Sequence, residues 1–104
     1  MTPADAKAAL DAQLAAHGET ITVKRGADSV SCRAQVRGVK ADEIEGMIMQ
    51  TDLRVIVSAT SFSTFGLIKA NDKVVIKGKE RQVKFSDPIY VDGTWVRCNL
   101  LVAG

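Results

Sequence analysis

Hydrophobic and polar residues alternate along most of the chain after Gly18. The clearest run covers residues 30–36, where Val30, Cys32, Ala34 and Val36 share one parity and polar residues occupy the positions between them. A period of two places one face of a strand in the core and the other in water. Further runs of this kind indicate a fold of about six β-strands, and they cover residues 20–24, 47–58, 74–76, 83–91 and 96–102.

Turn residues separate these runs and predict how the strands connect. Gly26, Gly78 and the pair Asp92-Gly93 are typical of tight hairpins. Within the run 83–91, Phe85 falls on the apolar parity and is expected to be buried, whereas Pro88 indicates an edge, a bulge or a bend. The pattern therefore predicts a mainly β fold, a small antiparallel barrel or sandwich.

The segment before Gly18 follows a helical period instead. Thr2 can cap a helix and Pro3 suits its first position, while Ala6, Leu10 and Leu14 recur on one face. Gly18 is expected to end the helix in the left-handed conformation. The chain, residues 1–104, is thus predicted to form a single domain, with a helix at about 3–17 and a barrel at about 19–103.

Composition adds few constraints. Hydrophobic residues make up 46% and charged residues 25% of the chain, as in ordinary globular proteins. The net charge of +2 does not by itself indicate a nucleic-acid or membrane-surface protein. No apolar run approaches the roughly 20 residues of a membrane span, and no basic segment leads into an apolar one at the N-terminus. We expect a cytoplasmic site of synthesis and no membrane partner.

The residue types that carry chemistry are sparse. His17 is expected to sit at a helix end, and Cys32 and Cys98 lie on the apolar parities of their strands as small buried hydrophobes. The acidic residues Asp42, Glu43 and Glu45 lack the ligand spacing of a calcium loop. Nucleotide-binding and nucleophile motifs are missing from the sequence. We predict no catalytic residues, no cofactor site and no metal site.

A cluster of basic residues near the hairpin at Gly78 favours a second interpretation. A small barrel with a basic face can bind single-stranded nucleic acid, but this mode also needs aromatic stacking platforms, which are few here. Asp72 and Glu80 dilute the cluster, so a solvated hairpin is the preferred interpretation. The cluster consists of Lys69, Lys73, Lys77, Lys79, Arg81 and Lys84.

Two segments predicted to be loops, residues 39–46 and 60–66, carry or border apolar side chains. Such residues either fold back onto the core or contact another protein, because exposed methionine and aromatic residues are enriched at interfaces. The candidate partner-binding residues are Ile44, Met47, Met49, Phe62 and Phe65.

The C-terminal two thirds of the chain resembles the head–tail joining proteins of tailed bacteriophages, which include head-completion, stopper and tail-attachment proteins. The resemblance lies in an ordered series of segments followed by a final strand after Asp92-Gly93. The series runs through residues 34–39, 51–57, 71–79 and 83–88. A helix before the barrel is also usual in that family, whereas the segment 39–50 is shorter than in many members.

The resemblance implies a structural role without catalysis. Such proteins form a ring below the portal or its adaptor, complete the DNA-filled head and present a docking surface to the tail. Portal or adaptor proteins, tail proteins and further copies of the same chain would be the partners, and DNA would only pass through the ring. The protein would reside in the virion after assembly in the bacterial cytoplasm. A tail-terminator or tail-tube subunit is the alternative within this class.

Overall fold

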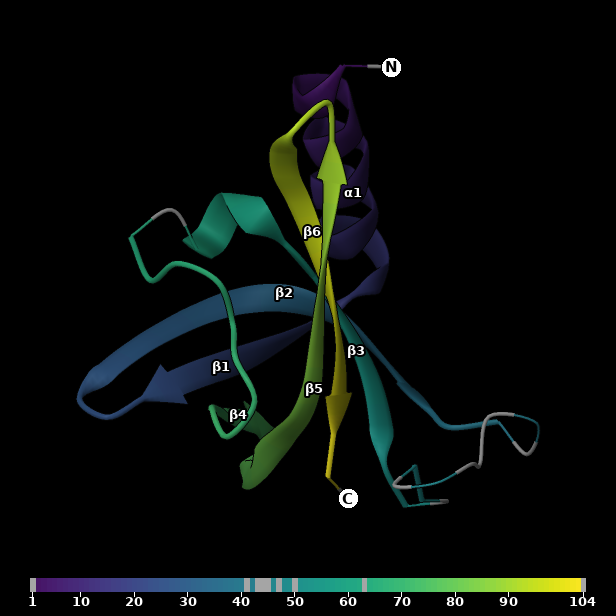
Figure 1. Cartoon of the computed structure of the whole chain (residues 1–104), viewed down its shortest axis with the longest axis vertical. Coiled ribbons are helices and arrows are strands. Elements are labelled where there is room, and N and C mark those ends of the chain that lie inside the picture. Colours follow the sequence, from purple (N-terminus) through teal and green to yellow (C-terminus); the bar gives the residue numbers. More distant parts are fainter. Residues whose placement is uncertain are drawn as a thin grey trace.

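A computed structural model describes residues 2–40, 42, 46, 48–49, 51–62 and 64–103. Within these residues one helix precedes six strands, which close into an antiparallel barrel in the order β1-β2-β3-β6-β5-β4 (Figure 1). This confirms the mainly β fold with an N-terminal helix. The elements are α1 (Pro3–His17), β1 (Glu19–Arg25), β2 (Asp28–Gly38), β3 (Leu53–Ser58), the short 3₁₀ helix η2 (Ala59–Phe62), β4 (Lys73–Ile76), β5 (Lys79–Val91) and β6 (Thr94–Val102).

Alternation along the strands sets the register of the barrel. Ile21 of β1 lies opposite Cys32 of β2, and Ala34 of β2 lies opposite Val57 of β3, so residues of the same apolar parity meet across neighbouring strands. The hairpin turn between β5 and β6 also forms at the residues where the sequence predicts it. Asp92 and Gly93 have φ values of 49° and 76°, which suit a two-residue turn that matches the strand twist.

Asp52 fixes the start of β3, which is later than the expected strand beginning at residue 47. The carboxylate of Asp52 is buried and accepts hydrogen bonds from the backbone N–H of Met49 at 2.9 Å and from Lys84 Nζ at 2.8 Å. Because a buried charge is costly without hydrogen-bond partners, these two bonds fix the position of the chain directly before β3. Met49 consequently lies outside the strand and is 59% exposed.

The expected burial of Phe85 is wrong. The pairing of β5 with β6 shifts register between Val83 and Phe85, which marks a β-bulge. Val83 is 1% exposed and points into the core, while Phe85 is 47% exposed. The extra residue reverses the parity of the positions that follow, up to a second register shift between Ile89 and Tyr90. The proline expectation holds, because Pro88 lies in a part of β5 that has a strand partner only on its β6 side.

The helix is anchored to the barrel at its C-terminal end. Thr2 and Asp5 form the capping box at its start. At its end, the guanidinium of Arg33 on β2 donates to the carbonyls of Leu14, Ala15 and Gly18, and the Ala15 carbonyl is one that the last turn leaves without a partner inside the helix.

Gly18 itself does not adopt the expected left-handed conformation, since its φ is −86° and its ψ is −176°. Glycine is needed there for a close approach instead. A Cβ atom at this position would lie 2.6 Å from the carbonyl oxygen of Leu14 and 2.7 Å from that of Ala34.

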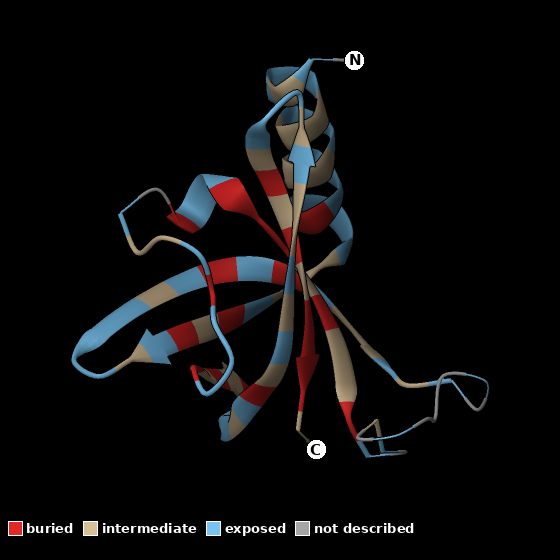
Figure 2. Cartoon of the chain, viewed as in Figure 1, coloured by how far each residue is buried: buried red, intermediate tan, exposed pale blue. Residues whose placement is uncertain are grey.

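Segment 59–72, which we call the plug segment, completes the barrel wall where strands do not. The short β4 pairs with β5 only up to Gln82, and β2 pairs with β1 alone over residues 28–33. The segment runs between these edges (Figure 1) and buries Phe62 and Ile68 in the core. The buried positions concentrate where the strands and this segment meet (Figure 2).

Truncating the plug should destabilise the fold strongly. Phe62 is completely buried, so Phe62→Ala should lower the free energy of unfolding by about 3–5 kcal/mol through lost contacts and the cavity left behind. Urea denaturation followed by circular dichroism measures this loss. The exposed Phe85→Ala should cost less than about 1 kcal/mol, and equal losses for the two variants would contradict the assignment of Phe62 to the core.

Candidate functional site

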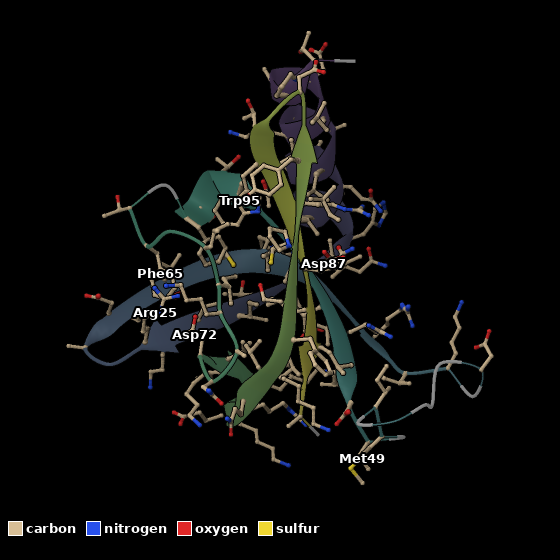
Figure 3. All side chains as sticks on the ribbon, viewed as in Figure 1. Arg25, Met49, Phe65, Asp72, Asp87 and Trp95 are labelled. Atoms are coloured by element: carbon tan, nitrogen blue, oxygen red, sulfur yellow. The ribbon has the colours of Figure 1, made fainter. Side chains whose placement is uncertain are left out.

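The plug segment is held by a partly buried ion pair that joins Arg25 at the end of β1 to Asp72, the residue before β4. Arg25 Nε lies 3.0 Å from Asp72 Oδ1, and Arg25 Nη2 lies 2.7 Å from Asp72 Oδ2 (Figure 3). The same guanidinium donates to the carbonyl of Leu67 at 2.7 Å and stacks 4.5 Å from the centre of the Phe65 ring. Lys69 N–H adds a bond to Asp72 Oδ2 at 2.8 Å. One arginine thus fixes three points of the segment, and we call this group the Arg25–Asp72 clamp.

The clamp sets the ionisation of Asp72. Burial acts to raise the pKa of this carboxyl, but the hydrogen bonds from Arg25 and Lys69 together with their positive charges outweigh it, so the pKa lies below its ordinary value of 3.8. A carboxylate whose pKa falls on folding contributes stability above its unfolded-state pKa. That contribution is lost as the pH drops through the lower folded-state value.

Of the five candidate residues, the structure describes Met49, Phe62 and Phe65, and it brings the two phenylalanines together. Met49 is exposed, while Ile44 and Met47 lie outside the described residues. Phe65 is half-buried, with its ring edge-on to Phe62 at a centroid distance of 5.9 Å. Phe62 is 0% exposed, so its selection as a partner-binding residue is wrong. Its ring belongs to the core cluster and packs against Phe65 and against Trp95, at a centroid distance of 6.3 Å from the latter.

A groove of about 410 Å³ lies between the plug segment and β5. We call it the β5 groove. Leu67, Ile68, Ala70, Phe85 and Pro88 supply its apolar lining, with Lys69, Lys84 and Ser86 beside them. Leu67 is 38% and Phe85 47% exposed, and Tyr90 farther along β5 is 51% exposed. Leu67 and Phe85 are thus exposed apolar residues of this groove, and the sequence did not identify either as a candidate partner-binding residue.

The edge of β5 beside this groove lacks a strand partner. Val83 exchanges backbone hydrogen bonds with Asn71 and Asp72 at 2.9 and 2.8 Å. Among the described residues, no further backbone hydrogen bond joins β5 residues 85–91 to the plug segment, and their strand pairing is with β6 alone. An apolar groove therefore runs beside an open strand edge.

The basic cluster is spread over a long stretch of the surface. Lys84 pairs with Asp52, and Glu80 lies 3.6 Å from Lys24. Arg81 lines a separate pocket of about 310 Å³ at the barrel end together with Arg37, Lys77 and Glu19. Lys79 and Tyr90 stand at opposite ends of β5, roughly 35 Å apart at the usual rise per residue. The cations at the hairpin tip therefore lack a nearby stacking platform in Tyr90.

Residues able to act as metal ligands or nucleophiles do not gather within the described part of the chain. No group of three or more His, Cys, Asp or Glu side chains there is placed to hold a metal ion. Burial raises the pKa of Cys32 to about 11, so its thiol is protonated at neutral pH. Cys98 is buried as well, and its sulfur lies 3.1 Å from Ser86 Oγ. Both thiols behave as core residues.

Comparisons of the chain with protein-family models, with curated proteins and with solved structures find no match in any of the three. Among the described residues, no helix has the length and apolar character needed to cross a bilayer. The β5 groove and its open strand edge are thus the features on which a functional proposal can be built.

Removing the clamp carboxylate should lower stability in a pH-dependent way. Asp72→Asn should cost about 1–3 kcal/mol at pH 7, a figure reduced from that of a fully buried pair because Arg25 is partly exposed. The difference from the unmodified protein should begin to shrink as the pH falls below 3.8, where the carboxyl of the unfolded chain takes up a proton, and should continue to shrink until the pH passes the lower folded-state pKa of Asp72.

Urea denaturation between pH 7 and pH 2.5 measures both effects. Glu80→Gln, which breaks the exposed pair with Lys24, serves as the control and should change stability by less than about 1 kcal/mol. A gap between Asp72→Asn and the unmodified protein that stays constant down to pH 2.5 would contradict the role given to this carboxylate.

Proposed function

We propose that this protein is a structural component of a bacteriophage neck, where it forms a ring between the portal or its adaptor and the tail. The β5 groove carries the proposal. Its exposed Leu67 and Phe85 are held by a strand and by a clamped segment, so they form a surface fixed in shape. Exposed apolar side chains gathered on one surface are typical of protein-binding sites.

The hairpin that carried the family resemblance adds support. Residues 71–79 include the end of the plug segment, β4 and the turn into β5, with Lys77 and Gly78 at φ values of 52° and 80°. The same stretch supplies Asp72 to the clamp and leads directly into the strand that borders the groove. The segments that resemble the joining family therefore supply the clamp carboxylate and, through residues 84–88, one wall of the groove.

Assembly into a ring would depend on the surfaces through which neighbouring copies make contact. A ring forms when one face of each copy contacts a different face of the next. The isolated protein would be mainly monomeric, since its remaining strand faces carry arginine and lysine, and the ring would form on the portal side, where neighbouring copies are held at high effective concentration. Heads would be completed in the bacterial cytoplasm, and DNA would pass through the lumen during ejection.

A tail-terminator or tail-tube subunit would use similar contacts at another level of the particle. The nucleic-acid alternative is less well supported, because Lys24 pairs with Glu80 beside the hairpin and Lys84 pairs with Asp52. Salt-dependent binding of single-stranded DNA that is lost on changing Lys77 and Lys79 would favour that alternative.

The proposal is tested by complementing a phage that lacks this gene. The double variant Leu67→Ser/Phe85→Ser removes apolar groove residues that are substantially exposed, so the isolated fold should remain intact. We expect full heads without attached tails and a loss of infectious particles of about a hundredfold or more, because a few central apolar residues carry most of the energy of a protein interface.

Ala12→Ser/Ala16→Ser on the exposed face of α1 is the matched control and should give normal yields. Electron microscopy of the particles distinguishes missing tails from tails of abnormal length, the defect expected of a tail-terminator. Tailed, infectious particles at normal yield from a folded Leu67→Ser/Phe85→Ser variant would rule out the groove as a joining surface.

A further inference from the structure

A pocket of about 310 Å³ lies at the end of the barrel where β5 begins, and we call it the barrel mouth. Its walls come from residues at or beside the ends of β1 to β5. We propose that the barrel mouth binds a small organic anion, in which a carboxylate or phosphate group is joined to a short apolar body. The barrel mouth shares no residue with the β5 groove, so it is a second site.

Arg81 lies on the inward face of the barrel at this end. It precedes Val83, which is 1% exposed, by two positions, and it pairs across the strands with Val74, which is 0% exposed. Alternate residues of a strand and residues opposite one another on neighbouring strands share a face of the sheet. A half-buried guanidinium on the core side of a strand keeps only part of its hydration, and it therefore needs partners for its donors.

The guanidinium of Arg81 has few such partners. Its Nη1 lies 3.4 Å from the carbonyl oxygen of Ala103, which is long for a hydrogen bond. Its Nε is buried and has no hydrogen-bond partner, and the salt bridges within the described part of the chain do not include this residue. A buried donor without a partner is costly, and an anion in the pocket would remove that cost.

The clamp shows what this edge of a guanidinium binds. Arg25 uses Nε and Nη2 to hold both carboxylate oxygens of Asp72. The same edge of Arg81 is suited to two oxygens of a carboxylate or a phosphate group. Because Nε is covered in the structure, the guanidinium would turn towards the pocket when the anion binds. The long bond to Ala103 would oppose that rotation only weakly.

Positive charge predominates among the described residues of the barrel mouth. Arg37 and Lys77 line it together with Arg81, and Glu19 supplies a carboxylate. A pocket with walls of one prevailing sign concentrates ions of the opposite sign. Glu19 has the parity of Ile21, which is 1% exposed, so its carboxylate lies on the inward face as well. This carboxylate opposes the binding of an anion, and its removal should strengthen binding.

The remaining wall of the barrel mouth is largely apolar. Val36, Leu53 and Ile76 occupy inward positions of β2, β3 and β4. Val36 and Leu53 are half-buried and pack against the core cluster, to which Ile76 belongs. Small-molecule sites combine apolar walls with a few charged groups that fix the orientation of the ligand, and they occupy about 300–1,000 Å³. The volume of the barrel mouth is at the lower end of this range, so its ligand is small.

The test titrates acetate, butyrate and monobutyl phosphate into the isotope-labelled full chain at constant ionic strength. Butyrate should shift the amide resonances of residues 36–38, 76–78 and 81–82. It should bind more tightly than acetate by about fourfold or more, the gain from burying one methylene group. Monobutyl phosphate distinguishes the two anion types, because tighter binding than butyrate assigns the site to phosphate groups and weaker binding assigns it to carboxylates.

Variants identify the groups that bind the anion. Arg81→Gln should weaken butyrate binding about tenfold, and Arg81→Lys should restore only part of it, since lysine keeps the charge but loses the planar fork. Glu19→Gln should instead tighten binding about threefold by removing repulsion. Lys69→Gln is the matched control, because it removes one positive charge at the β5 groove, and it should leave binding unchanged.

Unchanged binding by Arg81→Gln, equal weakening by Lys69→Gln, or shifts confined to another surface would overturn the inference. Equal affinities for acetate and butyrate would contradict the apolar body of the ligand. If Arg81→Gln does not fold, Glu19→Gln decides, and a failure of this variant to tighten binding would count against the site. The neck function is independent of these results, because particles carrying Leu67→Ser/Phe85→Ser test it separately.

Discussion

The bidentate pair of Arg25 and Asp72 is the interaction on which the rest of the structure depends. It joins residues 47 positions apart and fixes a segment that a short β4 would otherwise leave without support. The guanidinium also donates to the carbonyl of Leu67 and lies over the ring of Phe65. One side chain therefore positions both exposed and half-buried residues of the plug segment. The core closes beneath the clamp, and the groove forms beside it.

This arrangement links stability to the candidate surface. Phe62 and Ile68 are buried in the core and anchor the plug segment there. Leu67, which precedes Ile68, therefore points towards the surface beside β5. The bulge after Val83 turns Phe85 towards the same region. Two local features with separate causes thus bring apolar side chains together at a strand edge, and such a rigid surface would lose little conformational entropy when a partner binds.

The sequence predicted the features that depend on neighbouring residues. Alternation at 30–36 gave the inward face of β2, Thr2 gave the helix cap, and Asp92-Gly93 gave a hairpin turn. The sequence-based predictions were wrong where contacts between residues far apart in the chain determine which side chains are buried. Phe62 and Leu67 are both apolar residues in one irregular segment, and the clamp and barrel closure determine which is buried. The burial of Phe85 was predicted wrongly because the position of the bulge, between Val83 and Phe85, depends on the pairing of β5 with β6. The conformation of Gly18 was predicted wrongly because its constraint comes from the carbonyl of Ala34.

Hydrogen exchange at the amides of β5 tests the central claim most directly, since it reports on the open edge itself. In the isolated protein, the amide of Val83 should exchange slowly, while a subset of amides between Phe85 and Tyr90 that do not bond to β6 should exchange quickly. In the assembled particle, this subset should become protected. Amides that are already slow in the isolated protein, or that stay fast after assembly, would contradict an open edge used for joining.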